Sequence, residues 1–226
     1  MDRQSAATLP CMAGCCPSGD YHRFFNQRFA GRLANRYRKR GLDKTAQTMA
    51  QFLRALGLEG ASVLEIGGGV GELEVELLKV GAARAQNLEL SPAYQNQAHE
   101  LAAQAGLQGR IDWRIHDLAQ DPGAVEPADL VVLHRVVCCY PDYERLLAAA
   151  ADHARRALVF SYPPRSALSR AFYVVFNLVM RLTRSGFRGF AHPPGAMLGV
   201  LEDHGLRRTF QHRGRIWQVA GLERVS

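Results

Sequence analysis

The chain has 226 residues, of which 47% are hydrophobic, and a formal net charge of +7 at pH 7. A chain of this length can bury one substantial core, so we expect one domain with one principal site. No apolar run reaches the roughly 18 to 20 residues that cross a bilayer, and the start lacks a secretory signal, which predicts a cytoplasmic protein. The positive charge favours anionic partners without choosing among nucleic acid, a membrane surface and acidic small molecules.

The cysteines fall into two clumps. Cys11, Cys15 and Cys16 stand near the start, and Cys138 and Cys139 stand together much later. An odd number in two clumps differs from an extracellular disulfide framework, so we expect reduced thiols. The spacing of the first clump matches no common zinc finger, and we expect no metal site. The second clump is interpreted as two small hydrophobic side chains.

The first part of the chain is expected to hold a tail and a helical arm. Residues 1–20 mix Pro, Gly, Ser and Cys without apolar periodicity, which predicts a flexible tail. Residues 21–60 form the arm. Its first helix repeats an aromatic or aliphatic residue every four positions from Phe25, beside a row of arginines, and ends at Gly41. Asp43 can cap the second helix.

Residues 61–226 form the main predicted domain, in which short apolar strands alternate with helix-like segments. The strand candidates are Ser62–Ile66, Ala85–Leu90, Arg110–His116, Leu130–His134 and Ala157–Tyr162. This alternation predicts an α/β fold with a parallel, doubly wound, Rossmann-like sheet.

Two features depart from the alternation. Residues 163–195 are interpreted as an inserted cap segment, whose apolar helix carries several arginines on one narrow side. After a helix near Ala196–His204, strands are expected at Leu206–Gln211 and Arg215–Leu222, joined by His212–Gly214. The short connection predicts an antiparallel C-terminal hairpin, which completes a seven-stranded sheet.

The main chemical signal is a Gly-rich turn after the first strand. Gly67, Gly69 and Gly71 allow the backbone to approach a ligand closely, where a Cβ would collide. Such a turn alone is also compatible with a simple strand-to-helix connection. Two acids strengthen the ligand interpretation: Glu89 ends the second strand, where it can accept hydrogen bonds from ribose hydroxyls, and Asp117 ends the third, where it can accept from an adenine amino group.

The Gly-rich turn and the acids at successive strand ends resemble the class I S-adenosylmethionine (SAM)-dependent methyltransferases, and the resemblance extends over nearly everything from Phe24 onward. It implies SAM as the cofactor and S-adenosylhomocysteine as its product. It also implies that Glu65 and the glycines surround the methionine and ribose portions, that Glu89 binds the ribose, and that Asp117 meets the adenine.

A nicotinamide dehydrogenase is the rival interpretation, because it also uses a Gly-rich first turn and an acid on the second strand. Its G-x-G-x-x-G fingerprint requires glycine at position 72, where this chain has Glu72. A carboxylate at that helix start would repel a pyrophosphate, whereas SAM carries none.

The end of the fourth strand is expected to border the acceptor, since open parallel sheets bind ligands beyond the carboxyl ends of their strands. His134 and Tyr140 are candidate catalytic bases or substrate hydrogen-bonding groups, and Arg135 is a candidate partner for an anionic acceptor. A structural histidine and an ordinary ion pair of Arg135 stay open as alternatives. Methyl transfer needs a base only if the nucleophile must lose a proton, so a carboxylate acceptor would need none.

Within the family, the chain is loosely similar to magnesium-protoporphyrin O-methyltransferases. The similarity rests on Phe24-Phe25-Asn26, on the fourth-strand layout that ends in Tyr140, and on the apolar segment after Ser161-Tyr162-Pro163-Pro164. That group carries a histidine where this chain has Cys139. The similarity implies a small, lipophilic acceptor and slightly favours O-methylation.

Two other functions stay open, and so does the question of what the inserted helix contacts. RNA methylation is the alternative, since arginines of the first helix could track phosphates, but no RNA-binding module accompanies them, so nucleic acid is disfavoured as a partner. A non-catalytic SAM-binding protein is the third. The inserted apolar helix could roof a lipophilic pocket, rest at a membrane interface, pack into the core or contact a second copy, and the oligomeric state is unknown.

Overall fold

The computed structural model describes residues 24–184 and 186–225. Its helices are α2 (Gln27–Arg40), α3 (Lys44–Ala55), α4 (Glu72–Lys79), α5 (Gln95–Gln104), α6 (Tyr143–Asp152), α7 (Ala167–Leu182) and α8 (Pro194–Asp203). Its strands are β1 (Ser62–Ile66), β2 (Arg84–Glu89), β3 (Ile111–Ile115), β4 (Ala128–Leu133), β5 (Ala154–Tyr162), β6 (Leu206–Arg213) and β7 (Gln218–Arg224). The predicted flexible tail and the first cysteine clump lie outside the described residues.

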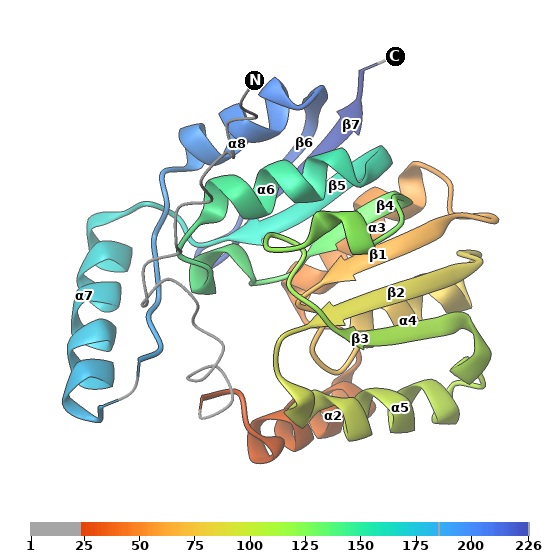
Figure 1. The fold of residues 1–226 in the computed structure, drawn as a ribbon, viewed down its shortest axis with the longest axis horizontal. Helices are drawn as coiled ribbons and strands as arrows, with labels where there is room; N and C mark the ends of the chain where they lie inside the picture. Colours follow the sequence, from red (N-terminus) through yellow and green to blue (C-terminus); the bar gives the residue numbers. More distant parts are fainter. Residues whose placement is uncertain (1–23, 185, 226) are drawn as a thin grey trace, which may run out of the picture.

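The seven strands form one sheet in the order β3-β2-β1-β4-β5-β7-β6 (Figure 1). β1 to β5 run parallel, whereas β7 runs antiparallel to both β5 and β6. The predicted Rossmann-like, seven-stranded sheet with an antiparallel C-terminal hairpin is therefore confirmed. The strand order reverses between β1 and β4, and the carboxyl ends at such a reversal border the crevice where open α/β sheets bind ligands.

The predicted connection of the hairpin was wrong. β6 continues through His212 and Arg213, which pair with Val219 and Gln218, so the chain turns at residues 214–217 instead of 212–214. β6 is an edge strand, and most of its side chains after the first are exposed. Because such a strand tolerates polar residues, its hydrophobic pattern did not mark where it ends.

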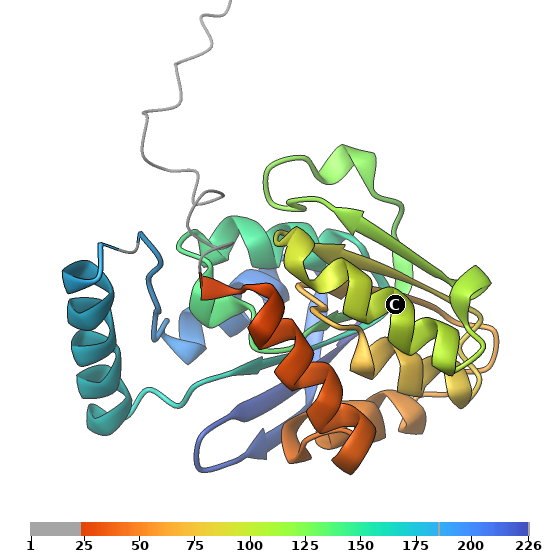
Figure 2. The same ribbon diagram turned by 90° about the horizontal axis from the view of Figure 1, so that it is seen from below.

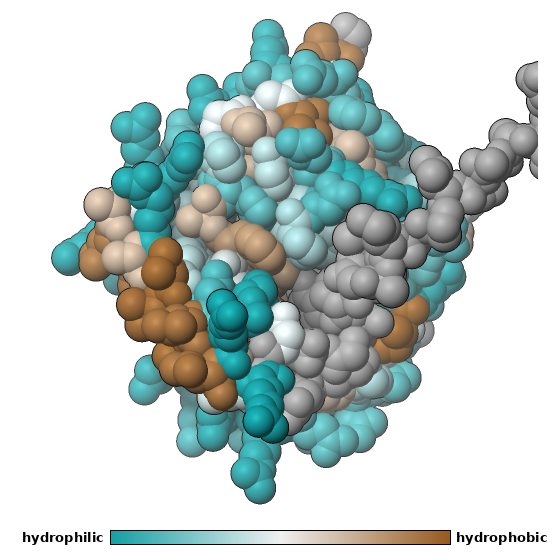
Figure 3. Space-filling view, turned by 60° about the vertical axis from the view of Figure 1, so that its left-hand side comes forward, coloured by the Kyte–Doolittle hydropathy of each residue, from teal (hydrophilic) through white to brown (hydrophobic). Residues whose placement is uncertain are grey.

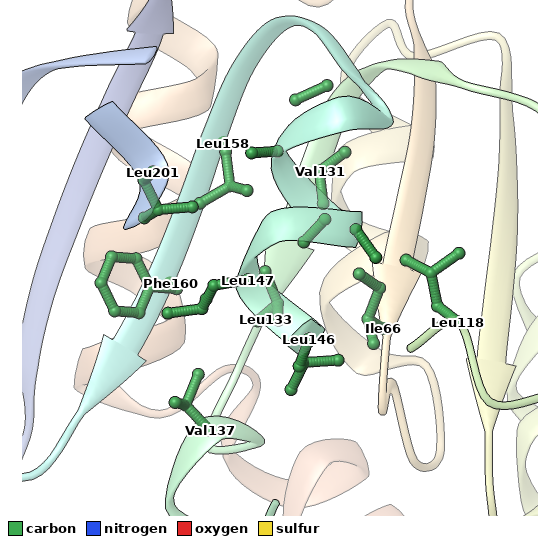
Figure 4. Packing of buried hydrophobic residues seen from close by; sticks show 14 of the residues in the cluster. Ile66, Leu118, Val131, Leu133, Val137, Leu146, Leu147, Leu158, Phe160 and Leu201 are labelled. Carbon is green, nitrogen blue, oxygen red and sulfur yellow. The ribbon is translucent and has the colours of Figure 1, made fainter. Parts of the chain in front are cut away.

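Helices cover both faces of the sheet, which explains why its central strands read as continuous apolar runs. α3 and α4 bury their apolar sides against one face, together with Val63, Leu130 and Val159. α6 and α8 cover the other face. Figure 4 shows part of that packing, in which the labelled residues are Ile66, Leu118, Val131, Leu133, Val137, Leu146, Leu147, Leu158, Phe160 and Leu201. The two layers hold the carboxyl ends of β1, β2 and β4 in fixed positions.

α7 stands outside this two-layered body. Figures 1 and 2 show it beyond the carboxyl end of β5, joined to the sheet by extended segments. None of its residues is buried, although it spans 16 residues. α2 begins on the same side of the molecule, so α7 and the start of α2 flank the carboxyl ends of the strands (Figure 2).

Two buried glutamates lie beneath the Gly-rich turn. The backbone N–H of Glu74 donates to Glu65 at 3.1 Å, and Asn87 Nδ2 donates to Glu74 Oε1 at 3.1 Å. Burial and the neighbouring carboxylates raise the pKa of both side chains, that of Glu74 to about 8. Glu74 Oε2 has no hydrogen-bond partner within the described part of the chain. Glu74 is therefore mainly a neutral acid at pH 7.

This buried acid makes stability depend on pH. The pKa of Glu74 is raised from 4.5 to about 8 in the folded chain. The folded chain therefore holds a proton that the unfolded chain has lost at pH values between these two, and its free energy of unfolding decreases as the pH rises from about 4.5 to 8. Glu74→Gln keeps the shape without the titrating proton. Its free energy of unfolding is expected to fall less than that of the wild type between about pH 5 and 9, by up to roughly 4 kcal/mol, because about 1.4 kcal/mol is lost for each pH unit between the two pKa values.

Urea denaturation at both pH values measures the difference. Glu59→Gln, at an exposed position, is the control and should follow the wild type. Equal pH slopes for Glu74→Gln and the wild type would show that Glu74 is ionised in the folded chain.

Candidate functional site

A cavity of about 310 Å³ opens at the carboxyl ends of β1, β2 and β4. Segments far apart in the sequence line it: the start of the described chain, the Gly-rich turn, the ends of the strands, the segment after β4, and α7. Its titratable lining side chains include Glu72, Glu89, His116, Asp117, His134, Arg135, Cys138, Cys139, Tyr140 and Tyr173. The cavity thus lies where the sheet topology predicts a ligand site.

The Gly-rich turn brings backbone to the wall of this cavity. Gly67, Gly69 and Gly71 have φ angles of +65°, +58° and +76°, which side-chain-bearing L residues rarely adopt. A Cβ at Gly67 would collide with Val136, and one at Gly71 with Glu74. Gly67 and Gly69 line the cavity, whereas Gly71 does not. The turn therefore needs glycine for its conformation, and two of the three predicted glycines face the site.

Glu89 holds the turn against the end of β2. Its carboxylate accepts hydrogen bonds from the backbone N–H groups of Gly69 at 3.0 Å, Leu90 at 2.8 Å and Ser91 at 3.0 Å. Burial raises the pKa of Glu89, although these three donors act in the opposite direction. The side chain lines the cavity at the position predicted for the ribose-binding acid.

Asp117 and Tyr140 form a pair on the cavity wall. The Tyr140 hydroxyl donates to Asp117, with 3.0 Å to Oδ2 and 3.1 Å to Oδ1. Burial and the adjacent carboxylate raise the pKa of Tyr140 to about 12. Tyr140 therefore keeps its proton at neutral pH and orients Asp117. Its use as a catalytic base stays a prediction, and this geometry does not favour it.

His134 also lines the cavity, but its ring nitrogens face protein groups. Nε2 lies 3.6 Å from the carboxylate of Asp43, and the side chain is 12% exposed. Nδ1 lies 3.3 Å from the hydroxyl of Ser161 and 3.3 Å from the sulfur of Met49. The ring is held in place by these neighbours, and its role as a base stays a prediction.

Arg135 follows His134 in an unusual backbone conformation, with a φ of +61°. Its guanidinium lies 2.7 Å from the carboxylate of Asp43 and 5.1 Å from the ring centre of Trp217. Its Nε has no hydrogen-bond partner among the described residues. The ion pair left open by the sequence is present, and the cation also lines the cavity, where it can meet an anionic ligand.

Asp43 is the residue that the sequence analysis missed as part of the site. Its cap of α3 is confirmed, with N–H donors from Thr45 at 2.8 Å and Ala46 at 3.0 Å. Burial alone would raise its pKa, but hydrogen bonds and the charges of His134 and Arg135 outweigh burial and hold the pKa well below its ordinary value. The capping pattern located Asp43, and no local signal indicated its partners His134 and Arg135, which follow β4.

Glu72 and Glu65 differ in whether their side chains reach the cavity. Glu72 lines the cavity, although the sequence analysis used it only to argue against a dinucleotide. Burial raises the pKa of Glu72, while His134 opposes this rise. Glu65, predicted to surround the cofactor, lies behind the turn against Glu74 and does not line the cavity.

Aromatic side chains form one wall of the cavity, which we call the aromatic wall. Phe24 stacks on Phe187 with ring centres 4.5 Å apart, and it meets Phe176 of α7 edge-on at 6.0 Å. Phe25 meets Phe187 edge-on at 5.3 Å. These contacts join the start of the described chain to α7, and Phe172 and Phe176 of α7 line the cavity. The cavity therefore has an acidic side and an apolar side.

Comparisons with known proteins indicate a methyltransferase domain. The family profile described as a methyltransferase domain matches residues 63–157. Ribosomal protein L11 methyltransferase of Aeromonas salmonicida is 35% identical over 92 residues, which are 41% of this chain and 30% of that protein. The chain therefore matches less than a third of the length of this relative.

Two solved structures share the fold. Magnesium protoporphyrin IX methyltransferase from Synechocystis PCC 6803, solved with bound S-adenosylhomocysteine, has a TM-score of 0.73 at 19% identity, with 93% of this chain and 100% of that chain covered. An O-methyltransferase family protein from Burkholderia thailandensis has a TM-score of 0.69 at 19% identity, with 92% and 63% covered.

The cavity also fits the cofactor of that fold. Its cofactor side presents the carboxyl groups of Glu72, Glu89 and Asp117 beside a cradle of backbone that a side chain would fill. Such a lining suits a nucleoside with a cationic sulfonium and ammonium, and it opposes a pyrophosphate. The sheet order, the Gly-rich turn and the matched methyltransferase domain all indicate a SAM-dependent methyltransferase. Residues 63–157 thus match the methyltransferase-domain family, and the described chain has the fold of known methyltransferases.

Proposed function

We propose that the protein transfers a methyl group from SAM to an oxygen of a small, lipophilic acceptor, and that a carboxylic acid is its first candidate. The observation that carries the proposal is the two-sided cavity, which joins an acidic cofactor side to an aromatic wall, with the guanidinium of Arg135 on its lining. An apolar body with one anionic group fits this combination.

The acidic side would hold the cofactor. Glu89 would accept hydrogen bonds from ribose hydroxyls, Asp117 would meet the adenine, and Glu72 would face the cationic methionine end. The bound cofactor supplies a methyl group on a positively charged sulfur, which an oxygen nucleophile attacks in line. Gly67 and Gly69 keep the wall free of side chains at this place.

The chain's own side chains favour an acceptor that is already an anion. Tyr140 keeps its proton and gives a hydrogen bond to Asp117. His134 Nδ1 faces Ser161, and its Nε2 lies 3.6 Å from Asp43 and has no hydrogen-bond partner among the described residues. An acceptor that must first lose a proton would lack an evident base in this geometry. A carboxylate needs none, and Arg135 can orient it while the aromatic wall excludes water.

The relatives support different parts of this proposal. The Synechocystis protein is named for magnesium protoporphyrin IX, a small-molecule substrate. The Aeromonas relative is named for a ribosomal protein, and its match extends over 41% of this chain. A cavity of about 310 Å³ with an aromatic wall supports a small acceptor over a protein surface.

RNA methylation receives less support. Two members of the basic row on α2 have partners within the protein: Arg36 pairs with Asp43 at 3.2 Å, and Arg38 pairs with Glu100 at 3.1 Å. These arginines stabilise the packing of α2, so the row offers fewer charges to phosphates than the sequence indicates.

Gly69→Arg tests the cofactor side. The φ of +58° at Gly69 disfavours any side chain, and an arginine there would enter the cavity. Isothermal titration with SAM should show an affinity at least about a hundredfold weaker, because the substitution combines backbone strain with occupation of the site. Gly109→Arg is the control, since Gly109 is exposed and has open space around it. Equal affinity in both variants would mean that SAM binds elsewhere.

Glu89→Gln tests the ribose contact and the anchoring of the turn. The amide loses the charge and turns an NH₂ group toward backbone donors, so SAM affinity should fall at least about tenfold in the same titration. Because burial raises the pKa of Glu89, the wild-type affinity should decrease on acidification before an ordinary carboxyl group is protonated. The exposed variant Glu126→Gln is the control. Unchanged affinity on replacing Glu89 would remove it from the cofactor site.

Arg135→Gln tests the acceptor side. Loss of the guanidinium should raise the KM for a lipophilic carboxylic acid by roughly tenfold to a hundredfold and leave SAM affinity unchanged, because a charged hydrogen bond to the acceptor is lost. Arg36→Gln is the matched control, since Arg36 also pairs with Asp43 but does not line the cavity. Steady-state kinetics with radiolabelled SAM measures both. An unchanged KM in Arg135→Gln would contradict an anionic acceptor held by this residue.

A further inference from the structure

The side of α7 that turns away from the body is apolar along the whole helix. Figure 3 shows it as a brown band of hydrophobic residues at the surface. We call it the outer face of α7, and its members are Leu168 (81% exposed), Phe172 (60%), Val174 (68%), Val175 (60%), Leu178 (55%), Val179 (44%) and Leu182 (74%). A contiguous apolar patch of this kind on a surface helix marks an interaction site, since a solvated helix face is normally polar.

Contacts on the opposite side fix the orientation of the helix. The Asn177 side chain donates to the carbonyl of Gly189 at 2.9 Å and accepts from its N–H at 2.8 Å. Tyr173 and Phe176 lie close to Gly189 on the same side. Rotation of α7 to bury the outer face would break these contacts, so the exposure of that face belongs to the fold.

Arginines border the outer face. At about 100° per residue, the outer face covers an arc of roughly 160°, and Arg170 and Arg181 lie between this arc and Asn177. Both arginines are exposed. The segment around them contains no acidic residue from position 153 to 201, and its arginines are Arg155, Arg156, Arg165, Arg170, Arg181, Arg184 and Arg188. The helix therefore combines an apolar face with a basic edge.

We propose that α7 docks on the surface of an anionic lipid bilayer, with its outer face in the boundary between headgroups and acyl chains and with Arg170 and Arg181 at the headgroups. Helices with this division of apolar and basic residues lie in the plane of such an interface. Among the helices of residues 24–184 and 186–225, none combines the length and apolar character needed to cross a membrane.

Charge favours the bilayer over a second copy of the chain. Two outer faces packed together would bring two arginine-rich segments close, and the segment from 153 to 201 offers no carboxylate to pair with them. An anionic lipid surface supplies the opposite charge and the apolar phase together. The same chemistry disfavours a neutral membrane.

The outer face continues into the cavity. Phe172 belongs to both, since it is 60% exposed and lines the cavity beside Tyr173 and Phe176. A lipophilic acceptor dissolved in the bilayer would reach the aromatic wall along this edge without crossing water. This route rests on the proposed function, whereas the docking of α7 does not.

Vesicle flotation with the full chain tests the docking. The probes are vesicles of phosphatidylcholine alone and vesicles of phosphatidylcholine and phosphatidylglycerol in equal parts. The wild type should float with the anionic vesicles, and its affinity for neutral vesicles should be at least about tenfold weaker.

Two sets of variants separate the apolar and the basic contributions. Leu168→Ser/Val175→Ser/Val179→Ser should weaken binding to anionic vesicles at least about tenfold, whereas Val80→Ser/Ile115→Ser/Val225→Ser, at exposed apolar positions elsewhere, should bind like the wild type. Arg170→Glu/Arg181→Glu should weaken binding by a similar factor. Arg54→Glu/Arg84→Glu, at exposed positions on α3 and β2, is the charge control.

Three outcomes overturn the proposal: no flotation of the wild type, equal flotation of the α7 variants and their controls, or a lipid-free dimer in sedimentation velocity that the α7 serine variant dissociates. The last outcome would assign the outer face to a second copy. Titration with SAM, without vesicles, runs in parallel on every variant. Vesicle binding without SAM binding would reject the proposed function alone, and SAM binding without vesicle binding would reject the docking alone.

Discussion

The hydrogen bonds to the carboxylate of Glu89 are the interaction on which the Gly-rich turn and the cavity beside it depend. The carboxylate accepts hydrogen bonds from the N–H group of Gly69 on one loop and from those of Leu90 and Ser91 on another, so it joins the loops that follow β1 and β2. A carboxylate is suited to this task, because its two oxygens can accept several hydrogen bonds at once. The Gly-rich turn could otherwise move away from the sheet, since its glycines have little conformational preference of their own. The side chain proposed to bind the ribose thus also holds the turn in place.

Asp43 performs a similar task for the segment that follows β4. It caps α3, pairs with Arg36 of α2 and with Arg135 after β4, and lies beside His134. Its hydrogen-bond donors and the nearby cations hold the pKa of this carboxyl group low despite burial, so Asp43 stays ionised. The cation of Arg135 is thereby held at the cavity wall, and the N-terminal helices become part of the site although they precede the sheet in the sequence.

Local signals were sufficient to predict the sheet and much of the cofactor side. The Gly-rich turn, Glu89 and Asp117 follow strands whose apolar runs are visible in the sequence, and parallel strands bring their ends together. The contacts of Asp43 and the place of Glu65 could not be predicted, because they depend on how α3 and α4 pack on the sheet. The end of β6 was missed for another reason, since an exposed edge strand has a weak hydrophobic pattern.

The distribution of charge connects the site with the surface. Glu72, Glu89 and Asp117 give one side of the cavity a negative character, whereas the segment from residue 153 to 201 carries arginines and no acids. A cationic cofactor and an anionic acceptor would therefore be drawn to opposite sides of one cavity. α7 belongs to the basic side and presents its apolar face outward, so the features that would suit a lipophilic anion inside the cavity continue on the surface that we propose to dock on an anionic bilayer. One inserted segment can thus serve acceptor recognition and membrane contact by the same chemistry.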